Sequence, residues 1–141
     1  EVADQLFDEY GEAAGGVPAA QVPEVLGRFP GARTAKVKVA EPGQSLCDDV
    51  ARVEAVRVAV PTVRVDANGG WSVEEAVAAA RALTAGGPLE YLEQPCRTVA
   101  ELAEVGASRA LERARDEILA TTHTYNAVRQ TIRMQGDGGS R

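Results

Sequence analysis

The sequence predicts an α/β fold in which three parallel strands form a segment of a (β/α) barrel, flanked by N-terminal and C-terminal helices. Two observations lead to this prediction. Strand-like and helix-like segments alternate along the middle of the chain, and the polar residues that end successive strands recur at 28 residues (Lys38 to Asp66) and 27 residues (Asp66 to Glu93). Parallel βαβ units need a period of this length, and (β/α)8 barrels repeat it.

The composition limits the classes of function. The chain has 141 residues, the length of one ordinary domain, and its 45% hydrophobic and 26% charged residues support a globular core. Its formal net charge of −6 argues against a nucleic-acid partner. The apolar runs are too short for a membrane span, and no signal peptide opens the chain. We therefore expect a cytoplasmic protein that handles small molecules or metal ions, with Cys47 and Cys96 as reduced thiols.

The first elements are helical. Residues 1–16 predict an N-terminal helix, because Val2, Leu6 and Tyr10 form one apolar stripe and glycines follow it. In the next segment, Pro18 and Pro23 can each open a helical turn. This segment begins the barrel-like domain that we predict over residues 17–106.

Strands and helices then alternate. Strands are predicted within TAKVKVAEPG, PTVRVDANGG and PLEYLEQP, since apolar residues alternate with polar ones and turn residues close each run. The two segments between them predict helices, with Ser45 and Ser72 as N-caps and with Asp48 and Glu75 three residues later, as in a capping box. Thr98 caps the start of a third helix.

The character of the sequence changes from about residue 107. Residues 107–134 predict an amphipathic helix, in which apolar or small residues from Leu111 to Ile132 recur at steps of three and four and form a seam. Residues 135–141 predict a flexible tail.

Three parallel strands also leave open edges that something must cover. We therefore expect a homo-oligomer that forms through the strand edges or through the 111–132 helix.

Polar side chains gather at the predicted strand ends. Because side chains alternate along a strand, Lys36 and Lys38 share one face, and the parallel arrangement brings Lys38, Asp66 and Glu93 together at the carboxyl ends. Two carboxylates suit Mg²⁺, which takes oxygen ligands, and a lysine beside the cation can act as a general base. We predict Asp66 and Glu93 as metal ligands, and Lys38 and Lys36 as catalytic residues.

Three motifs, TAKVKVAEPGQSL, VRVDANGGW and GPLEYLEQPC, resemble the enolase superfamily over about residues 17–105. The resemblance is strongest to the o-succinylbenzoate synthases of menaquinone biosynthesis in their actinobacterial form. It implies a Mg²⁺-dependent lyase that dehydrates a cyclohexadiene carboxylate to o-succinylbenzoate. It further implies that Lys38 removes the proton α to the carboxylate, and that Mg²⁺, held by Asp66 and Glu93, stabilises the enediolate.

The resemblance also implies features that the chain does not show. These are a third acidic ligand, a second lysine on a later strand and the about 250 residues of a complete barrel. We therefore expect a partial barrel that is flanked by unrelated sequence, is inactive alone, and can repack or oligomerise. The alternative is a non-catalytic, self-associating domain derived from a chimera or a fragment. The single histidine, His123, is expected to be a surface or packing residue and not a ligand.

Overall fold

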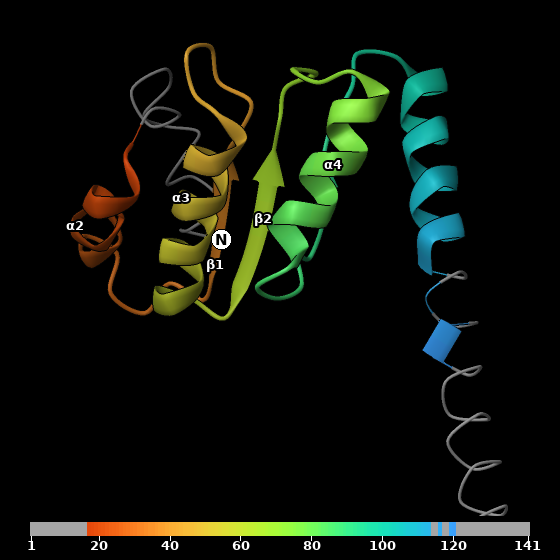
Figure 1. Ribbon diagram of the computed structural model, residues 1–141. Helices are drawn as coiled ribbons and strands as arrows, with labels where there is room; N and C mark the ends of the chain where they lie inside the picture. Colours follow the sequence, from red (N-terminus) through yellow and green to blue (C-terminus); the bar gives the residue numbers. More distant parts are fainter. Residues whose placement is uncertain (1–16, 114–115, 117–118, 121–141) are drawn as a thin grey trace, which may run out of the picture. The chain divides into compact units, whose positions relative to one another are not determined.

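The computed structural model describes residues 17–113, 116, 119 and 120 (Figure 1). The predicted helix at 1–16, the tail at 135–141, most of the 111–132 seam and His123 lie outside the described residues. The chain divides into two units, Glu1–Val105 and Gly106–Arg141. In the second unit, Arg109 pairs with Glu112 along the helix at 2.6 Å. The domain boundaries after residues 16, 106 and 134 stay predictions.

The described elements alternate between helix and strand in the predicted order. Residues 99–113 form a further helix at the end of this series. In the part of the chain that the structure describes, no helix is long and apolar enough to cross a membrane. The named elements are η1 (Ala19–Gln21), α2 (Val22–Gly27), β1 (Thr34–Lys38), α3 (Leu46–Ala59), β2 (Thr62–Asp66), α4 (Val73–Thr84) and β3 (Leu92–Glu93).

The three strands form one parallel sheet in the order β1-β2-β3, which confirms the predicted partial α/β fold. The strand predicted within PLEYLEQP is shorter than expected, because β3 holds only Leu92 and Glu93. Hydrogen bonding to β2 nevertheless begins earlier, since the amide of Glu90 donates to the carbonyl of Val63 at 2.9 Å. The prolines at 88 and 95, which have no amide proton, flank this short pairing.

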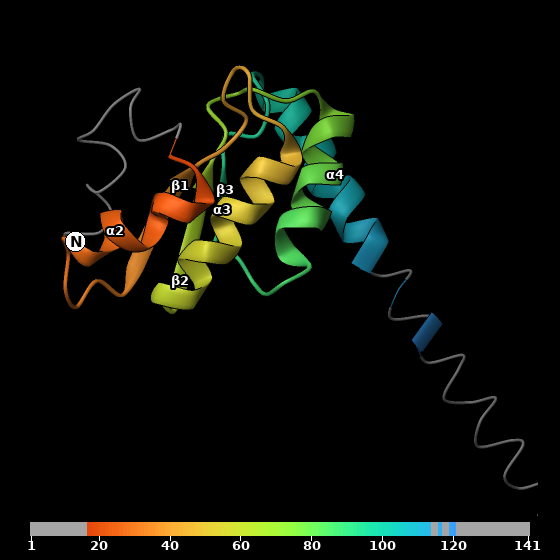
Figure 2. The ribbon, with the colours of Figure 1, turned by 60° about the vertical axis from the view of Figure 1, so that its left-hand side comes forward.

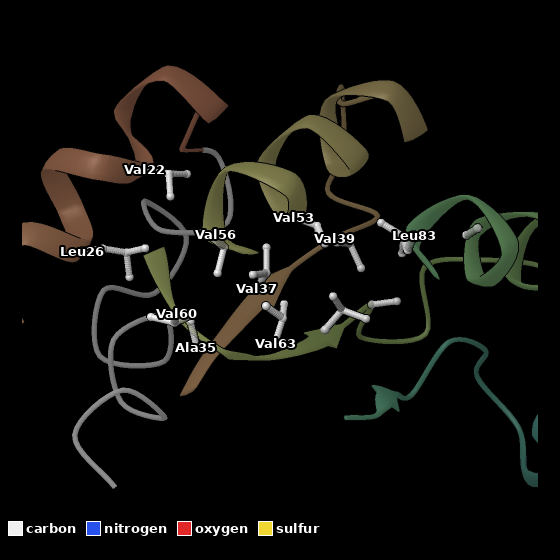
Figure 3. Close-up of a cluster of buried hydrophobic side chains, with 13 residues drawn as sticks. Val22, Leu26, Ala35, Val37, Val39, Val53, Val56, Val60, Val63 and Leu83 are labelled. Atoms are coloured by element: carbon white, nitrogen blue, oxygen red, sulfur yellow. The ribbon is translucent and has the colours of Figure 1, made fainter. Parts of the chain in front are cut away.

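A valine-rich core fills the space between the sheet and the helices (Figure 3). On β1, Ala35 and Val37 are buried, while Lys36 and Lys38 on the opposite face are partly exposed, as the alternation predicted. Helix α3 packs on β1 and β2, and it contacts η1 and α2 as well as α4 (Figures 1 and 2). The polar face of the sheet therefore lies opposite to the helical layer.

The predicted N-caps are confirmed. The side chain of Ser45 accepts a hydrogen bond from the amide of Asp48, and that of Ser72 from the amide of Glu75, and both form complete capping boxes. Thr98 caps the following helix, because its hydroxyl accepts from the amide three residues later at 3.2 Å. These caps fix where each helix begins, and so they fix the length of the loop that leaves each strand.

Candidate active site

Three of the four residues predicted to carry the chemistry lie at one edge of the sheet. Lys38, Asp66 and Glu93 are each the last residue of a strand. The parallel register pairs Lys38 with Asp66 and Asp66 with Glu93. Because α/β proteins place their sites at the carboxyl ends of parallel strands, this edge is the candidate active site.

Lys38 donates hydrogen bonds to one acceptor at the end of β2 and to another in the loop that follows it. Its Nζ donates to Oδ2 of Asp66 at 2.7 Å and to Oδ1 of Asn68 at 3.0 Å. Because the side chains of Lys38 and Asp66 are only 17% and 6% exposed, the pair is largely shielded from water. Sequence reasoning missed Asn68, since an asparagine before two glycines is also an ordinary turn residue.

Lys36 joins the two carboxylates of the site. Its Nζ lies 2.8 Å from Oε2 of Glu93 and 3.7 Å from Oδ2 of Asp66. Asp66 therefore faces two ammonium groups. Glu93 is less enclosed, because 44% of its side chain is exposed. The structure thus brings together all four residues that the sequence singled out.

The surroundings of Asp66 determine its charge. Burial alone would raise the pKa of this carboxyl group, but hydrogen bonds from Lys38 and from the amide of Asn68, together with the charges of Lys38 and Lys36, outweigh burial. The amide of Asn68 donates to Oδ1 at 2.9 Å. The net effect holds the pKa of Asp66 below its ordinary value, so the group is ionised at neutral pH.

Asp66 and Glu93 fit Mg²⁺ by the chemistry of their donors. Both offer carboxylate oxygens, and protein sites often hold Mg²⁺ through one or two carboxylates together with waters or substrate oxygens. Lys36 contacts both groups, so a cation would replace that ammonium as their counter-ion. Among the described residues, no group of three or more His, Cys, Asp or Glu could hold a metal ion. These two residues therefore form a partial donor set.

Each loop that follows a strand contains one residue other than glycine with a left-handed backbone conformation. Ala40, Asn68 and Gln94 have φ angles of 60°, 48° and 41°. Outside glycine and asparagine this conformation costs on the order of 1 kcal/mol, so the surrounding structure must hold it. The loops also bind one another, because the amide of Gly69 donates to the carbonyl of Gln94 at 2.7 Å.

Farther down the same face of the sheet, Arg64 forms another polar group. Its guanidinium lies 5.2 Å from the centre of the Tyr91 ring and pairs with Glu90. Arg64 precedes Asp66 by two residues, so the two side chains share the face that alternation predicted.

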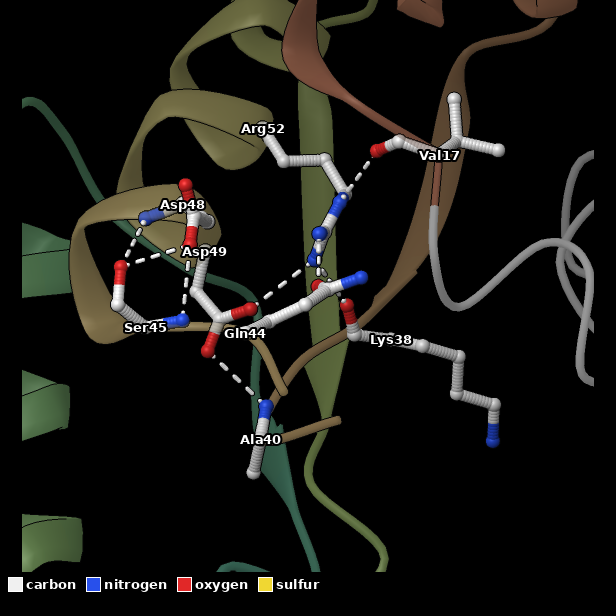
Figure 4. A network of polar contacts seen from close by, with 8 residues as sticks. All are labelled: Val17, Lys38, Ala40, Gln44, Ser45, Asp48, Asp49 and Arg52. Atoms are coloured by element: carbon white, nitrogen blue, oxygen red, sulfur yellow. Dashed lines mark hydrogen bonds and ion pairs between the residues drawn. The ribbon is translucent and has the colours of Figure 1, made fainter. Parts of the chain in front are cut away.

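A buried ion pair lies behind the site. Asp48 and Asp49 both lie in the first turn of α3, where Asp48 completes the capping box through its bonds to Ser45. Asp49 is only 1% exposed and, in addition, pairs with Arg52 at 3.0 Å (Figure 4). The sequence does contain a signal for the burial of this pair, because positions 49 and 52 fall on the same inward stripe of the helix as Val53 and Val56.

Comparison with known sequences supports the resemblance. A model of the enolase C-terminal domain-like family matches residues 21–134, which extends beyond residue 105, where the predicted resemblance ends. The o-succinylbenzoate synthases of Mycobacterium ulcerans and Mycobacterium tuberculosis are 67% and 69% identical over 110 residues, or 72% of this chain and 34% of each relative. The chain thus spans about a third of the length of these relatives.

Solved structures agree with the fold. A dipeptide epimerase from Enterococcus faecalis superposes with a TM-score of 0.54 at 33% identity, over 64% of this chain and 28% of that protein. An enolase from Mycobacterium smegmatis, in complex with formate and acetate, gives a TM-score of 0.53 at 33% identity, over 63% of this chain and 20% of that protein. Both matches cover only part of the larger protein.

Proposed function

This chain belongs to the enolase C-terminal domain-like family, and we propose that it supplies one part of the active site of a Mg²⁺-dependent o-succinylbenzoate synthase in menaquinone biosynthesis. The observation that carries this proposal is the contact of Lys38 with Asp66 at 2.7 Å, with Glu93 on the next strand. The proposal is also supported by the identity of 67–69% to enzymes of that name.

Lys38 is the proposed acid–base group. Lys38 is an ammonium in its contact with Asp66, so it first gives up a proton to solvent. The neutral amine then takes the proton α to the substrate carboxylate, and the C–H bond electrons move toward that carboxylate. The electrons return to form the new C=C bond as the hydroxyl on the neighbouring carbon leaves, and this hydroxyl takes the proton back from Lys38 and departs as water. Two acceptors, Asp66 and Asn68, set the position of Nζ. Lys36 on the same face adds positive charge close to the site, which favours an anionic substrate.

Asp66 and Glu93 are the residues that would hold Mg²⁺. A bound Mg²⁺ would supply positive charge against the oxygens of the substrate carboxylate. Asp66 is suited to this role because it is ionised at neutral pH and largely buried. Glu93 is more exposed, so it can turn toward a cation with little change in its surroundings.

Product formation tests this proposal. The chain is incubated with Mg²⁺ and the cyclohexadiene carboxylate substrate, alone and with a second polypeptide that covers the rest of a relative. We expect o-succinylbenzoate in at least one of the two mixtures, and Lys38→Met should lower the rate by about 100-fold or more. The proposal is abandoned if neither mixture forms product above background.

A second candidate function is non-catalytic self-association of a chimeric or fragment-derived domain. The observation that favours it is the exposure of large apolar side chains, namely Val58 at 90%, Val99 at 82% and Leu111 at 73%. In the described sheet, β1 and β3 are also edge strands, which can pair with another chain. Sedimentation over a wide concentration range separates the two functions, because a strictly monomeric chain excludes this one.

A further inference from the structure

We propose that Arg52 is a positioning residue for Lys38. In this view the buried guanidinium of Arg52 fixes the backbone where β1 ends, and the backbone in turn fixes the direction of the lysine side chain. The inference rests on the proposed function in one respect, because that proposal gives Lys38 its role. The contacts of Arg52 are independent of any activity.

The peptide unit that follows Lys38 is held from both sides. On one side, the amide of Val39 donates to the carbonyl of Asp66 at 3.0 Å, which extends the pairing of β1 with β2. On the other side, Nη1 of Arg52 donates to the carbonyl of Lys38 at 2.9 Å. Because a peptide unit is planar, two opposed bonds fix its orientation, and with it the backbone torsion that directs the Lys38 side chain.

The next peptide unit is held by the partner of Arg52. The amide of Ala40 donates to Oδ2 of Asp49 at 3.0 Å, while Oδ1 of the same carboxylate binds Arg52 at 3.0 Å (Figure 4). Ala40 is the residue with a φ of 60°, a conformation that alanine does not favour. The ion pair therefore supports the strained turn directly behind the lysine.

Arg52 also binds two other segments. Its Nε donates to the carbonyl of Val17 at 2.8 Å, and its Nη2 donates to the side chain of Gln44. The planar guanidinium thus reaches four partners in fixed directions, which the single ammonium of a lysine cannot do.

The burial of this pair argues for a role in geometry. Arg52 is 2% exposed and Asp49 is 1% exposed, and they share the buried face of α3 with Val53 and Val56. Replacing a buried ion pair with apolar side chains of similar volume is often neutral or stabilising, so stability alone gives little reason for charges here. Fixing the end of β1 does give a reason.

Arg57 on the same helix provides a matched control. Its Nη2 donates to the carbonyl of Leu83 at 2.6 Å, and its Nε pairs with Glu54 at 3.1 Å. It therefore links α3 to backbone carbonyl groups as Arg52 does, but its partners lie away from the end of β1. Arg57→Met should lower stability without a local effect at Lys38.

Amide hydrogen exchange tests the inference in the full chain. The double variant Asp49→Asn/Arg52→Met removes the donor to Lys38 without leaving a buried charge unpaired. The exchange of Val39 is compared with that of Val65, whose amide donates to the carbonyl of Tyr91 at 3.2 Å in the middle of the sheet. We expect Val39 exchange to accelerate about tenfold more than Val65 exchange, because its peptide unit loses a buried hydrogen bond.

The result that would overturn the inference is an equal acceleration of Val39 and Val65 in the double variant, as expected for Arg57→Met. If the double variant does not fold, Arg52→Lys serves instead. This variant keeps the positive charge beside Asp49 but loses the planar guanidinium, whose N–H groups bind several partners at once. Arg52→Lys should still accelerate amide exchange at Val39 more than at Val65, and an equal acceleration at both amides overturns the inference.

Turnover separates this inference from the proposed function. Where product forms, the double variant should lower kcat and leave KM unchanged, since Arg52 does not touch the substrate. If Val39 exchange accelerates selectively but the chain forms no product either alone or with the second polypeptide, the proposed function fails and the positioning of Lys38 by Arg52 stands. If product forms and Val39 does not respond, the positioning role of Arg52 fails alone.

Discussion

Gly70, in the loop after β2, provides a sharp test of how the candidate site is assembled. A Cβ at this position would lie 2.7 Å from Cβ of Ala40, 3.0 Å from the carbonyl oxygen of Ala67 and 3.1 Å from that of Ala40. These atoms belong to the backbone or are attached directly to it, so no side-chain rotation relieves the contact. Gly70→Ala must therefore separate the loops that follow β1 and β2.

The expected cost follows from the rigidity of the Ala40 loop. Ala40 is held at a φ of 60° and its amide is bound by Asp49 at 3.0 Å, so it cannot move without loss of that bond. Overpacking of this kind costs about 1–3 kcal/mol of unfolding free energy. In urea unfolding followed by circular dichroism, this cost corresponds to a fall in the midpoint of about 1 M.

Gly27→Ala is the matched control. Gly27 ends α2 and has no heavy atom within 4 Å of an added Cβ. We expect this change to raise the unfolding free energy by about 0.5 kcal/mol, because alanine loses less conformational entropy than glycine in a helix. If Gly70→Ala leaves the midpoint unchanged, or if both variants shift it in the same direction, the loops do not pack as described.

Three further predictions concern stability. Val37→Ala should lower the unfolding free energy by about 2 kcal/mol, because Val37 is fully buried, while Val58→Ala at an exposed position should change it by less than about 0.5 kcal/mol in the same urea assay. Ser72→Ala should cost about 1 kcal/mol, since the capping box is lost, and a smaller change in thermal unfolding would contradict the cap. The backbone and side-chain hydrogen bonds of Ser45 lower the pKa of Asp48, so the stability that Asp48 contributes is present above the ordinary carboxyl pKa of 3.8 and is lost as the pH falls through the lowered value. Asp48→Asn should therefore lose less stability than the wild type on acidification below about pH 4, and parallel pH profiles would refute this.

Much of the fold followed from local signals in the sequence. The alternation of lysine and valine on β1 and the serine caps before α3 and α4 depend on neighbours within a few residues, and all of them are found in the structure. The length of β3 was predicted less well. Its pairing depends on β2, a partner about 27 residues away, and the motif itself does not reveal where that ladder ends.

The charged residues of the candidate site could be predicted from the sequence, but the residues that hold them in place could not. The near-equal spacings of 28 and 27 residues identified Lys38, Asp66 and Glu93, because residues at the same place in successive parallel strands lie side by side. Arg52 was missed, although it lies on the buried stripe of α3, because a charged residue on a helix is usually exposed to solvent. Its contact with the carbonyl of Lys38 links residues that only the folded chain brings together.

Binding of Mg²⁺ tests most directly whether Asp66 and Glu93 act as one site. Calorimetric titration of the wild type is compared with Asp66→Asn, Glu93→Gln and Lys36→Met. We predict that each carboxylate variant weakens binding by about tenfold or more. Lys36→Met should tighten binding, because it removes a positive charge that lies 2.8 Å from Glu93 and 3.7 Å from Asp66. The central claim is contradicted if the wild type does not bind Mg²⁺, or if the carboxylate variants bind it as tightly as the wild type.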